Sequence, residues 1–341
     1  MICQRKTLVT GATGLVGNNV VRLLLERGEA VRVLQRTSSD PRPLENLDVE
    51  VARGDVCDPQ SLHAACVGIE RVVHAAGHVH IGWSGADKHH AINVEGTRNV
   101  VAAASQAGAR LVHVSSVDTL GYGTKQQPAD EETEPVNTSI PYPASKLAAE
   151  RIVTQAVEEQ RVEAVIVNPV YMFGPWDWRP SSGQMILEVV RNNGVFPPRG
   201  SNDFCDVRDV ASGILAALDR GQPGRRYILG GECLTYIEAF RLIARITGGF
   251  SAICRVDPVT QWIAGFVGDV YGKIRGREPS VNTAAIALSR QPHHFNYARA
   301  ASELGYSPRP ASEAIRAAYE WFLEHGYIPP SKRRPLSAKS E

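Results

Sequence analysis

From residue 7 to residue 168, short β-branched runs alternate with stretches whose apolar residues recur at helical spacing. The runs are apolar throughout, so we expect strands that are buried on both faces. Buried strands separated by helices form a parallel sheet with helices on both sides. The predicted fold class is therefore α/β, a doubly wound, Rossmann-like parallel sheet. The expected strands are 7–10, 31–34, 49–51, 71–76, 110–116 and 164–168, and the expected helices include 15–27, 93–106 and 144–160.

Beyond the sixth expected strand, loops rich in Pro, Gly and Trp separate patterns that are mainly helical. We assign residues 1–170 to a dinucleotide-binding domain and residues 171–330 to a smaller, mostly helical, discontinuous substrate lobe. The buried run RYIL (226–229) predicts a return to the main sheet near 203–230. Residues 331–341 are expected to be a disordered tail. The expected helices of the lobe are 235–247, 259–275, 283–290 and 311–324.

Composition excludes several classes of protein. Lys+Arg 37 against Asp+Glu 36 gives no overall field that would recruit nucleic acid or an acidic membrane surface, so any partner must be recognised locally. Six cysteines without a C-x-x-C pair match neither a disulfide framework nor a zinc ligand set. We expect no secretory signal before the first strand, and no apolar segment reaches the roughly 20 residues that span a bilayer. We expect a cytoplasmic protein with a small-molecule substrate, with neither nucleic-acid binding nor membrane insertion.

The run GATGLVG follows the first strand directly and opens a helix, the context in which a glycine fingerprint has meaning. Gly11 permits a tight turn, Gly14 lets backbone N–H groups approach a pyrophosphate, and Gly17 allows close helix packing. The spacing is G-x-x-G-x-x-G, and the alternative is a plain strand-to-helix turn. The candidate phosphate-binding residues are Gly11, Thr13, Gly14, Leu15, Val16 and Gly17.

The second strand ends in Gln35-Arg36, where an NAD-binding fold usually places an acidic residue for the ribose hydroxyls. A carboxylate there repels a 2′-phosphate and an arginine attracts one, so we favour NADP(H). The alternative is that the chain binds NAD(H), with Arg36 stacked on the adenine. Two residues after the third strand are candidates to contact the edge of the adenine, Asp55 and Val56. Three small residues after the fourth strand would let the dinucleotide lie against the strand end, Ala75, Ala76 and Gly77.

Tyr142 and Lys146 are four residues apart at the start of a helical pattern, so they lie on one helix face. A phenol with a reference pKa of about 10 needs a nearby positive charge to act as an acid or base near neutrality. Lys146 can supply that charge and hold the nicotinamide ribose. Ser115 and Ser116 end the fifth strand, at the sheet edge where ligands bind, and can polarise a carbonyl or simply satisfy backbone groups.

Four histidines cluster after the fourth strand, at positions 78, 80, 89 and 90. Their H-x-H and H-H spacings match no common zinc arrangement, so we predict no metal site. Lining a substrate pocket beside Trp83 is the preferred alternative to ordinary loop histidines. The candidate substrate contacts are His78, Trp83, Ser116, Asp118 and Tyr171.

The motifs GATGLVG, GDV, HAAG, NVEGT, SSVDTLG and YPASK occur in the order typical of one family. The chain, over roughly residues 5 to 328, resembles the extended short-chain dehydrogenase/reductase superfamily, also called the NAD-dependent epimerase/dehydratase superfamily. The runs VRVLQR, VNPVYMFGP, RYILGGECLT and ELGYSPRP are most similar to dihydroflavonol-reductase-like and hopanoid-associated sugar epimerase proteins. A homodimer is the assembly that this resemblance implies.

The resemblance implies roles for several residues. Ser116, five residues before Gly121, stands in the catalytic Ser/Thr position, with Tyr142 as proton donor and acceptor and Lys146 as its partner. Asn93 of NVEGT resembles the asparagine that braces the sheet near the cofactor. The segment that resembles the one along the nicotinamide face is Asn168, Pro169 and Val170.

The chain departs from the family pattern at two places. Sugar dehydratases carry Asp-Glu after the catalytic Thr/Ser, but this chain has Val117-Asp118, which argues against a dehydratase. The segment that usually reads F-x-H-V-x-D-V is FCDVRDV here, which leaves the roles of Asp206 and Arg208 open.

The leading hypothesis is an NADP(H)-dependent oxidoreductase that reduces a carbonyl or oxidises the corresponding alcohol. The alternatives are a nucleotide-sugar epimerase with retained NAD(P) and, from another class, a non-catalytic dinucleotide-sensing regulator. An aromatic pocket would suit an apolar ketone, and an arginine clamp would suit a nucleotide diphosphate. The aromatic residues, which could equally be core, are Trp176, Trp178, Trp262 and Phe266, and the arginines are Arg191, Arg199, Arg225 and Arg226.

Overall fold

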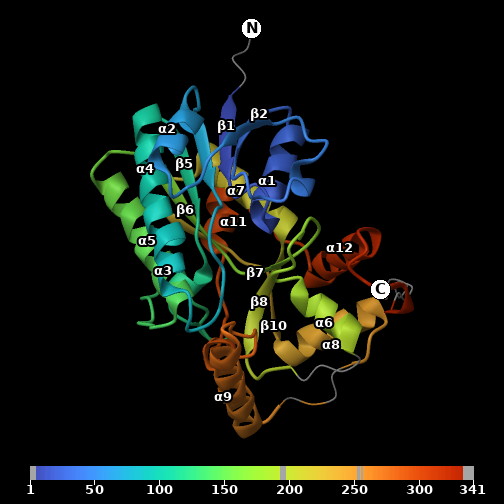
Figure 1. The fold of residues 1–341 in the computed structure, drawn as a ribbon. Coiled ribbons are helices and arrows are strands. Elements are labelled where there is room, and N and C mark those ends of the chain that lie inside the picture. Colours follow the sequence, from blue (N-terminus) through green and yellow to red (C-terminus); the bar gives the residue numbers. More distant parts are fainter. Residues whose placement is uncertain (1–4, 193–196, 252–253, 255, 333–341) are drawn as a thin grey trace.

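Seven parallel strands form the main sheet of the computed structural model, in the order β3-β2-β1-β4-β5-β6-β9 (Figure 1). The order reverses between β1 and β4, as in dinucleotide-binding sheets. The predicted α/β class and doubly wound sheet are confirmed. The strands are β1 Lys6–Thr10, β2 Ala30–Gln35, β3 Glu50–Arg53, β4 Arg71–His74, β5 Arg110–Val114, β6 Ala164–Pro169 and β9 Arg226–Leu229, within described residues 5–192, 197–251, 254 and 256–332.

Neighbouring residues of a strand point to opposite faces of the sheet. Because the strands are apolar, helices cover both faces of the main sheet. Leu8 packs into the core under α2, α4 and α5, whereas Val9 packs into the core under α1, α7 and α11. Figure 1 shows these two layers on either side of the sheet. The helices are α1 Leu15–Glu26, α2 Pro59–Cys66, α4 Gly96–Ala107, α5 Pro141–Glu158, α7 Val207–Arg220 and α11 Ala298–Leu304; α3 Ala86–His89 and a π-helical turn His90–Glu95 lead into α4.

The C-terminal part is helical as predicted, and it also contains a second, three-stranded sheet in the order β10-β8-β7 that was not predicted. The sequence did not reveal it because β7 has three residues and β8, with the sequence SNDFCD, is mainly polar and shows no alternation. Its core stacks Phe173 on Phe204, with ring centroids 5.5 Å apart. The elements are β7 Tyr171–Phe173, β8 Ser201–Asp206, β10 Glu232–Thr235, α6 Gln184–Asn192, α8 Tyr236–Thr247 and α12 Ala311–Glu324.

The chain passes from β8 of the second sheet to α7 and β9 beside the main sheet, and then returns to β10. The division into two domains with the predicted boundaries stays a prediction. Of the tail expected over 331–341, residues 333–341 lie outside the described residues.

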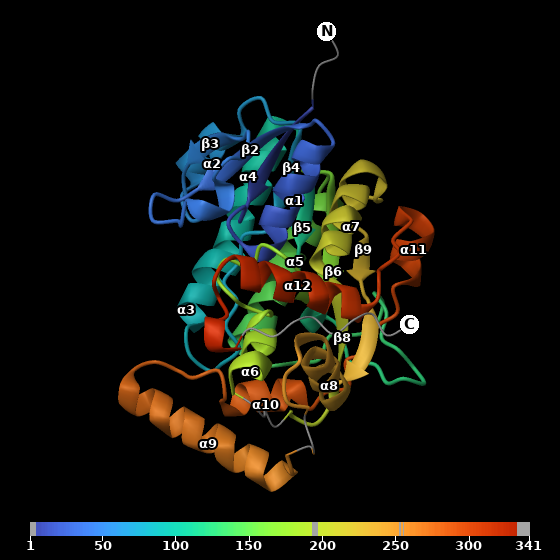
Figure 2. The ribbon, with the colours of Figure 1, turned by 90° about the vertical axis from the view of Figure 1, so that its right-hand side faces the viewer.

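Two helices, α9 (Pro258–Arg275) and α10 (Thr283–Ser289), project from the end of the molecule opposite the N-terminal strand, as Figure 2 shows. They pack against one another. Within the part of the chain that the structure describes, no helix combines the length and apolar character needed to cross a membrane.

The turn between β1 and α1 depends on two glycines. Gly11 has φ +71°, and a Cβ there would lie 2.6 Å from the backbone of the segment after β4. A Cβ on Gly17 would lie 2.3 Å from the carbonyl oxygen of Gly11. A Cβ on Gly14 meets only that same oxygen, at 3.4 Å. The fold itself therefore requires Gly11 and Gly17, but not Gly14.

Replacing Gly17 should therefore destabilise the fold far more than replacing Gly14. Gly17→Ala is expected to lower the free energy of unfolding by about 1–3 kcal/mol, because backbone must shift to admit the methyl group. Gly14→Ala is the matched control and should cost less than about 1 kcal/mol. Urea unfolding followed by circular dichroism measures both, and equal losses would contradict this account of the turn.

Candidate active site

The turn between β1 and α1 lies where the strand order of the main sheet reverses, which is the usual ligand crevice of such sheets. Gly14 is the N-cap of α1, and no side chain among the described residues caps it. The first turn of α1 carries no acidic residue. Its N–H groups and partial positive charge therefore fit the pyrophosphate of a dinucleotide. Thr13, Leu15 and Val16 lie in the same turn, as predicted from the sequence.

The segment after β4 connects the glycine turn to the buried lysine. The backbone of Ala75 and Ala76 lies directly against Gly11. A Cβ built on Gly77 would lie 3.5 Å from both Asn93 Oδ1 and Lys146 Nζ. This segment of small residues therefore forms the path of the chain from the glycine turn to Lys146.

The far end of the crevice carries two arginines. Arg36 is exposed directly after β2. Arg53 ends β3, lies opposite Gln35 in the sheet register, and donates to the Gln35 side-chain oxygen at 2.9 Å. Sequence reasoning missed Arg53, although its place at the end of the third strand was a usable signal. Asp55 and buried Val56 follow, and the Asp55 carboxylate accepts the backbone N–H two residues later at 3.0 Å.

The structure brings Tyr142, Ser116 and Asp118 together at the carboxyl end of β5. Ser116 Oγ donates to Asp118 Oδ2 at 3.0 Å and accepts the Asp118 N–H at 3.2 Å. Burial and the Asp118 carboxylate raise the pKa of the Tyr142 phenol, while a hydrogen bond with Ser116 lowers it. The phenol is thus protonated at neutral pH and lies beside the serine hydroxyl.

Lys146 lies buried one helical turn after Tyr142, and its Nζ donates to the Val114 carbonyl oxygen at 2.8 Å. Burial lowers the pKa of Lys146 to about 8, with the Glu150 carboxylate acting in the opposite direction. The sequence predicted that Lys146 would make the Tyr142 phenol acidic. That prediction also required the positive charge of the nicotinamide; without it burial dominates and raises the pKa of Tyr142, so the role of Lys146 stays a prediction.

Asn93 lies in the π-helical turn before α4, a type of turn that is often found at functional sites. Its Oδ1 accepts the His78 N–H at 2.7 Å, and its Nδ2 donates to the His78 carbonyl oxygen at 3.0 Å. Nδ2 also lies 2.9 Å from Ser145 Oγ in α5. Asn93 thus joins the segment after β4 to the helix that carries Tyr142 and Lys146.

Behind Ser116, a buried network fixes the serine loop. Asn168 Nδ2 lies 3.0 Å from the Ser116 carbonyl oxygen, 3.0 Å from Thr119 Oγ1 and 2.6 Å from Glu150 Oε1. Thr119 Oγ1 also lies 2.7 Å from Glu150 Oε1. The Asn168 amide therefore faces the serine loop. The role predicted for Asn168, Pro169 and Val170 along the nicotinamide stays a prediction. Buried Ser115 Oγ has no partner among the described residues.

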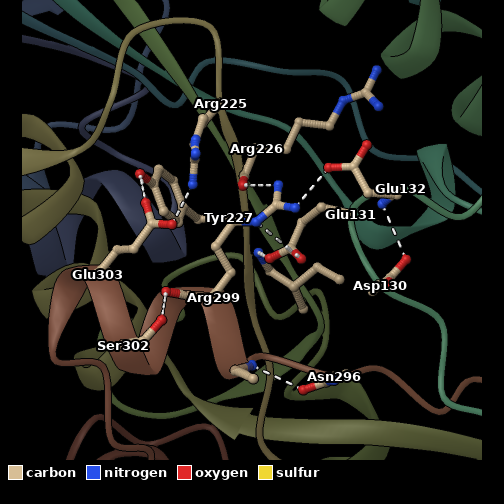
Figure 3. Close-up of polar contacts among 12 residues, drawn as sticks. Asp130, Glu131, Glu132, Arg225, Arg226, Tyr227, Asn296, Arg299, Ser302 and Glu303 are labelled. Atoms are coloured by element: carbon tan, nitrogen blue, oxygen red, sulfur yellow. Dashed lines mark hydrogen bonds and ion pairs between the residues drawn. The ribbon is translucent and has the colours of Figure 1, made fainter.

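Arginines that could clamp a diphosphate are engaged elsewhere. Arg226 Nε lies 3.1 Å from Glu150 Oε2, and Arg225 forms an ion pair with Glu303. In Figure 3, Arg299 also reaches Glu132, at 2.6 Å, on the outer edge of the main sheet. The hollow beside them is lined by both charges. Arg191 and Arg199 donate to the backbone carbonyl oxygens of Tyr327 and Val256.

His89 lies beside Tyr142, and His78 lies beside His89. The His78 ring lies 4.6 Å from that of His89, which lies 6.0 Å from the Tyr142 ring. Burial lowers the pKa of His78 to about 4 and lowers that of His89. Both rings are therefore neutral at neutral pH. Across the described residues, no group of three or more His, Cys, Asp or Glu side chains is arranged to hold a metal ion.

Trp83 and Tyr171 are held by other contacts. Trp83 is 47% exposed, and its Nε1 donates to Thr283 Oγ1 in α10 at 2.7 Å. The Tyr171 hydroxyl donates to the Ser182 carbonyl oxygen at 3.1 Å. Their role as substrate contacts stays a prediction.

The four aromatic residues of the later part do not form one pocket. Trp176 and Trp178 pack against Trp321 with ring centroids 6.0 Å and 5.2 Å from it. Trp262 and Phe266 stack on one another on α9 and are exposed. The first pair therefore lies against the core of the second sheet, and the second pair faces outward.

The second departure from the family pattern, at Asp206 and Arg208, has a structural explanation. Asp206 is the N-cap of α7 and accepts the Arg208 N–H at 2.8 Å. The Arg208 guanidinium pairs with the same carboxylate at 2.5 Å. The two residues therefore hold each other at the point where the chain returns to the main sheet.

The burial of Lys146 has a consequence for stability. The folded pKa of about 8 lies below the ordinary value of 10.5, so above pH 8 the unfolded chain binds the extra proton and the folded chain does not. Relative to Lys146→Met, the free energy of unfolding of the natural chain should therefore rise between pH 8 and pH 10.5. Urea unfolding across this range measures it, with exposed Lys88→Met as control. If the difference in free energy of unfolding between the natural chain and Lys146→Met does not change with pH, the burial of the charge is contradicted.

Comparison with known proteins places the chain in a family. Residues 7–230 match the model of the NAD dependent epimerase/dehydratase family. A protein named "Putative dihydroflavonol 4-reductase" from Synechocystis sp. is 36% identical over 331 residues, covering 94% of this chain and 95% of the relative. Sterol demethylase protein B from Methylococcus capsulatus is 35% identical over 329 residues, covering 94% of this chain and 99% of that protein.

A solved structure agrees with this assignment. The crystal structure of gox2253 is 36% identical in sequence, has a TM-score of 0.83, and covers 95% of this chain and 100% of that chain. The resemblance seen in the sequence motifs is therefore confirmed. The chain belongs to the NAD dependent epimerase/dehydratase family and is an oxidoreductase of that family.

Proposed function

We propose that the chain is an NADP(H)-dependent reductase of a carbonyl group in a small organic substrate, dihydroflavonol-reductase-like, which also oxidises the corresponding alcohol. The observation that carries the proposal is the meeting of Tyr142 and Ser116 beside buried Lys146, at the end of the path from the glycine turn. This is where an open parallel sheet binds its ligand.

Each of the three residues has a separate task. Ser116 hydrogen-bonds the substrate oxygen and orients it toward Tyr142. Tyr142, whose pKa is raised, holds its proton at neutral pH and donates it to that oxygen. The bound cofactor supplies the hydride for reduction, and its oxidised nicotinamide carries a positive charge that favours the phenolate. Lys146 holds the nicotinamide ribose and adds its own charge below about pH 8, the value to which burial lowers its pKa.

The preference for NADP(H) rests on the charges at the end of β2. Arg36 is exposed there, and Arg53 lies beside Gln35. Two guanidinium groups attract a 2′-phosphate, and β2 ends without the carboxylate that would repel it. A guanidinium that stacks on the adenine of NAD(H) is the competing arrangement.

The substrate class is proposed from two observations. The neutral His89 ring lies 6.0 Å from the Tyr142 ring and the neutral His78 ring lies 4.6 Å from that of His89, so this side of the phenol is polar but uncharged. The two relatives that match nearly the whole chain carry names of a dihydroflavonol reductase and a sterol demethylase protein, both for multi-ring compounds. We infer a largely apolar, ring-containing ketone.

The alternatives have weaker support. A nucleotide-sugar epimerase needs a diphosphate site, but Arg225 and Arg226 are paired with Glu303 and Glu150. Stoichiometric NAD(H) that stays with the purified protein through dialysis would identify that alternative. A non-catalytic dinucleotide sensor has no need of Tyr142 and Lys146 together.

We also expect a cytoplasmic location. The five cysteines among the described residues are free, which is the usual state of thiols in the cytoplasm.

Tyr142→Phe is the first test of this function. A screen with NADPH across aliphatic, aromatic and sterol ketones, with UDP- and GDP-sugars alongside, first identifies a substrate. Turnover of the variant on that substrate should fall by about 10²–10⁴-fold, since it lacks the proton donor. NADPH affinity should change less than about threefold, because the phenol hydroxyl is one contact among many. Tyr297→Phe is the control, and unchanged turnover of Tyr142→Phe would refute the assignment.

Arg36→Glu tests the cofactor. The variant should lose at least about tenfold in NADPH affinity and gain affinity for NADH, because a carboxylate repels the 2′-phosphate and accepts ribose hydroxyls. Fluorescence titration with each dinucleotide measures the ratio. Arg161→Glu, on the exposed surface, is the charge-matched control. An unchanged NADPH-to-NADH ratio in Arg36→Glu would show that Arg36 does not read the 2′-phosphate.

A further inference from the structure

Helix α9 packs against the protein with its small and polar side chains, which a surface helix usually turns toward solvent. Its buried residues are Gln261, Gly265 and Gly272. A Cβ on Gly268 would lie 1.9 Å from the Val281 carbonyl oxygen, which precedes α10, so only glycine allows this close approach. Asp269 also faces α10, where its carboxylate accepts the Thr283 N–H at 3.1 Å. The inner face of α9 is therefore small and polar.

The outer face of the same helix is large and apolar. Trp262 is 58% exposed, and Ile274 is 78% exposed. A surface helix of a globular domain normally buries such residues and exposes the polar ones. The side chains follow one face at helical spacing over 18 residues, a length of roughly 27 Å. The exposed apolar residues are Val259, Trp262, Ile263, Phe266, Val267, Val270, Tyr271 and Ile274.

The exposed charges at the C-terminal end of α9 are positive, whereas the exposed N-cap, Asp257, is acidic. Lys273 and Arg275 lie in the last turn of α9, and Arg277 follows it. The two carboxylates of the segment are occupied, Asp257 by the first N–H groups of α9 and Asp269 by Thr283. An apolar face with exposed Trp, Phe and Tyr and a basic end is typical of a helix that lies in a bilayer interface.

We propose that the outer face of α9 is a binding surface for an anionic phospholipid bilayer. The apolar side chains enter the boundary between headgroups and acyl chains, and the basic residues at the C-terminal end contact the phosphate groups. The helix lies on the bilayer and does not cross it, in agreement with the helix lengths and hydropathy of the described residues. This surface is local, so it is compatible with the near-zero net charge of the chain.

The bilayer surface would be coupled to the candidate active site through Glu278, which follows α9 directly. Its carboxylate accepts the N–H groups of Trp83 at 2.9 Å and Ser84 at 3.0 Å. It also lies 3.1 Å from His80 Nε2. These residues belong to the segment after β4 that begins beside the crevice and carries His78. Glu278, together with the hydrogen bond between Trp83 and Thr283, thus joins the region of the proposed lipid surface to the segment after β4.

Vesicle flotation of the full chain tests this inference. The protein should float with vesicles of phosphatidylcholine and phosphatidylglycerol, and less with phosphatidylcholine alone. The double variant Trp262→Ser, Phe266→Ser should bind at least about tenfold more weakly, since apolar area no longer enters the interface. Lys273→Ala, Arg275→Ala should lose roughly 25-fold on anionic vesicles, about fivefold for each charge. Exposed Val67→Ser, Val136→Ser is the matched control and should bind like the natural chain.

A second copy of the chain is the competing occupant, and analytical ultracentrifugation without lipid distinguishes it. The proposal is overturned if the natural chain does not float, or if the α9 variants float as well as the control. It is also overturned if Trp262→Ser, Phe266→Ser dissociates a dimer and the natural chain does not bind vesicles. Trp262 gives an independent signal: its emission should shift to the blue when vesicles are added, and Trp262→Phe should lack that part of the shift.

Discussion

The contact between the Lys146 ammonium and the Val114 carbonyl oxygen fixes the candidate active site. It holds α5 against the carboxyl end of β5 and places a buried positive group beside Gly77. Burial lowers the pKa of this lysine, so the fold retains a destabilising charge at neutral pH. We infer that this charge is useful only when a dinucleotide lies in the crevice. From the same position Lys146 can then hold the nicotinamide ribose and act on Tyr142, the proton donor.

Two hydrogen-bonded networks keep this geometry in place from opposite sides. Asn93 joins the segment after β4 to Ser145 in α5. Asn168 and Glu150 hold the loop that carries Ser116, and Arg226 pairs with Glu150 from the outer edge of the sheet. Because these groups are buried and bonded to one another, removal of one leaves the others unpaired at considerable cost. The networks explain how Tyr142 and Ser116 meet although they come from different elements.

The main sheet could be predicted because its strands are apolar on both faces and follow the glycine turn. The small sheet could not, since β7 is very short and its neighbour Ser201–Asp206 carries polar residues that tertiary contacts bury. Residue spacing predicted that Tyr142 and Lys146 share a helix face, but it could not predict the direction of the phenol's pKa shift. That direction depends on burial and on Asp118, which only the folded chain brings near. Periodicity likewise located α9 without revealing that its apolar face points outward.

The central claim concerns where the reactive end of the cofactor lies, and a crystal structure with NADPH tests it most directly. Our account predicts the pyrophosphate at the N-terminus of α1 and Lys146 Nζ within about 3 Å of a nicotinamide ribose hydroxyl. The Tyr142 and Ser116 hydroxyls should face the same side of the nicotinamide ring. A ring bound away from these three side chains, or a Tyr142 hydroxyl that points out of the crevice, would contradict the account.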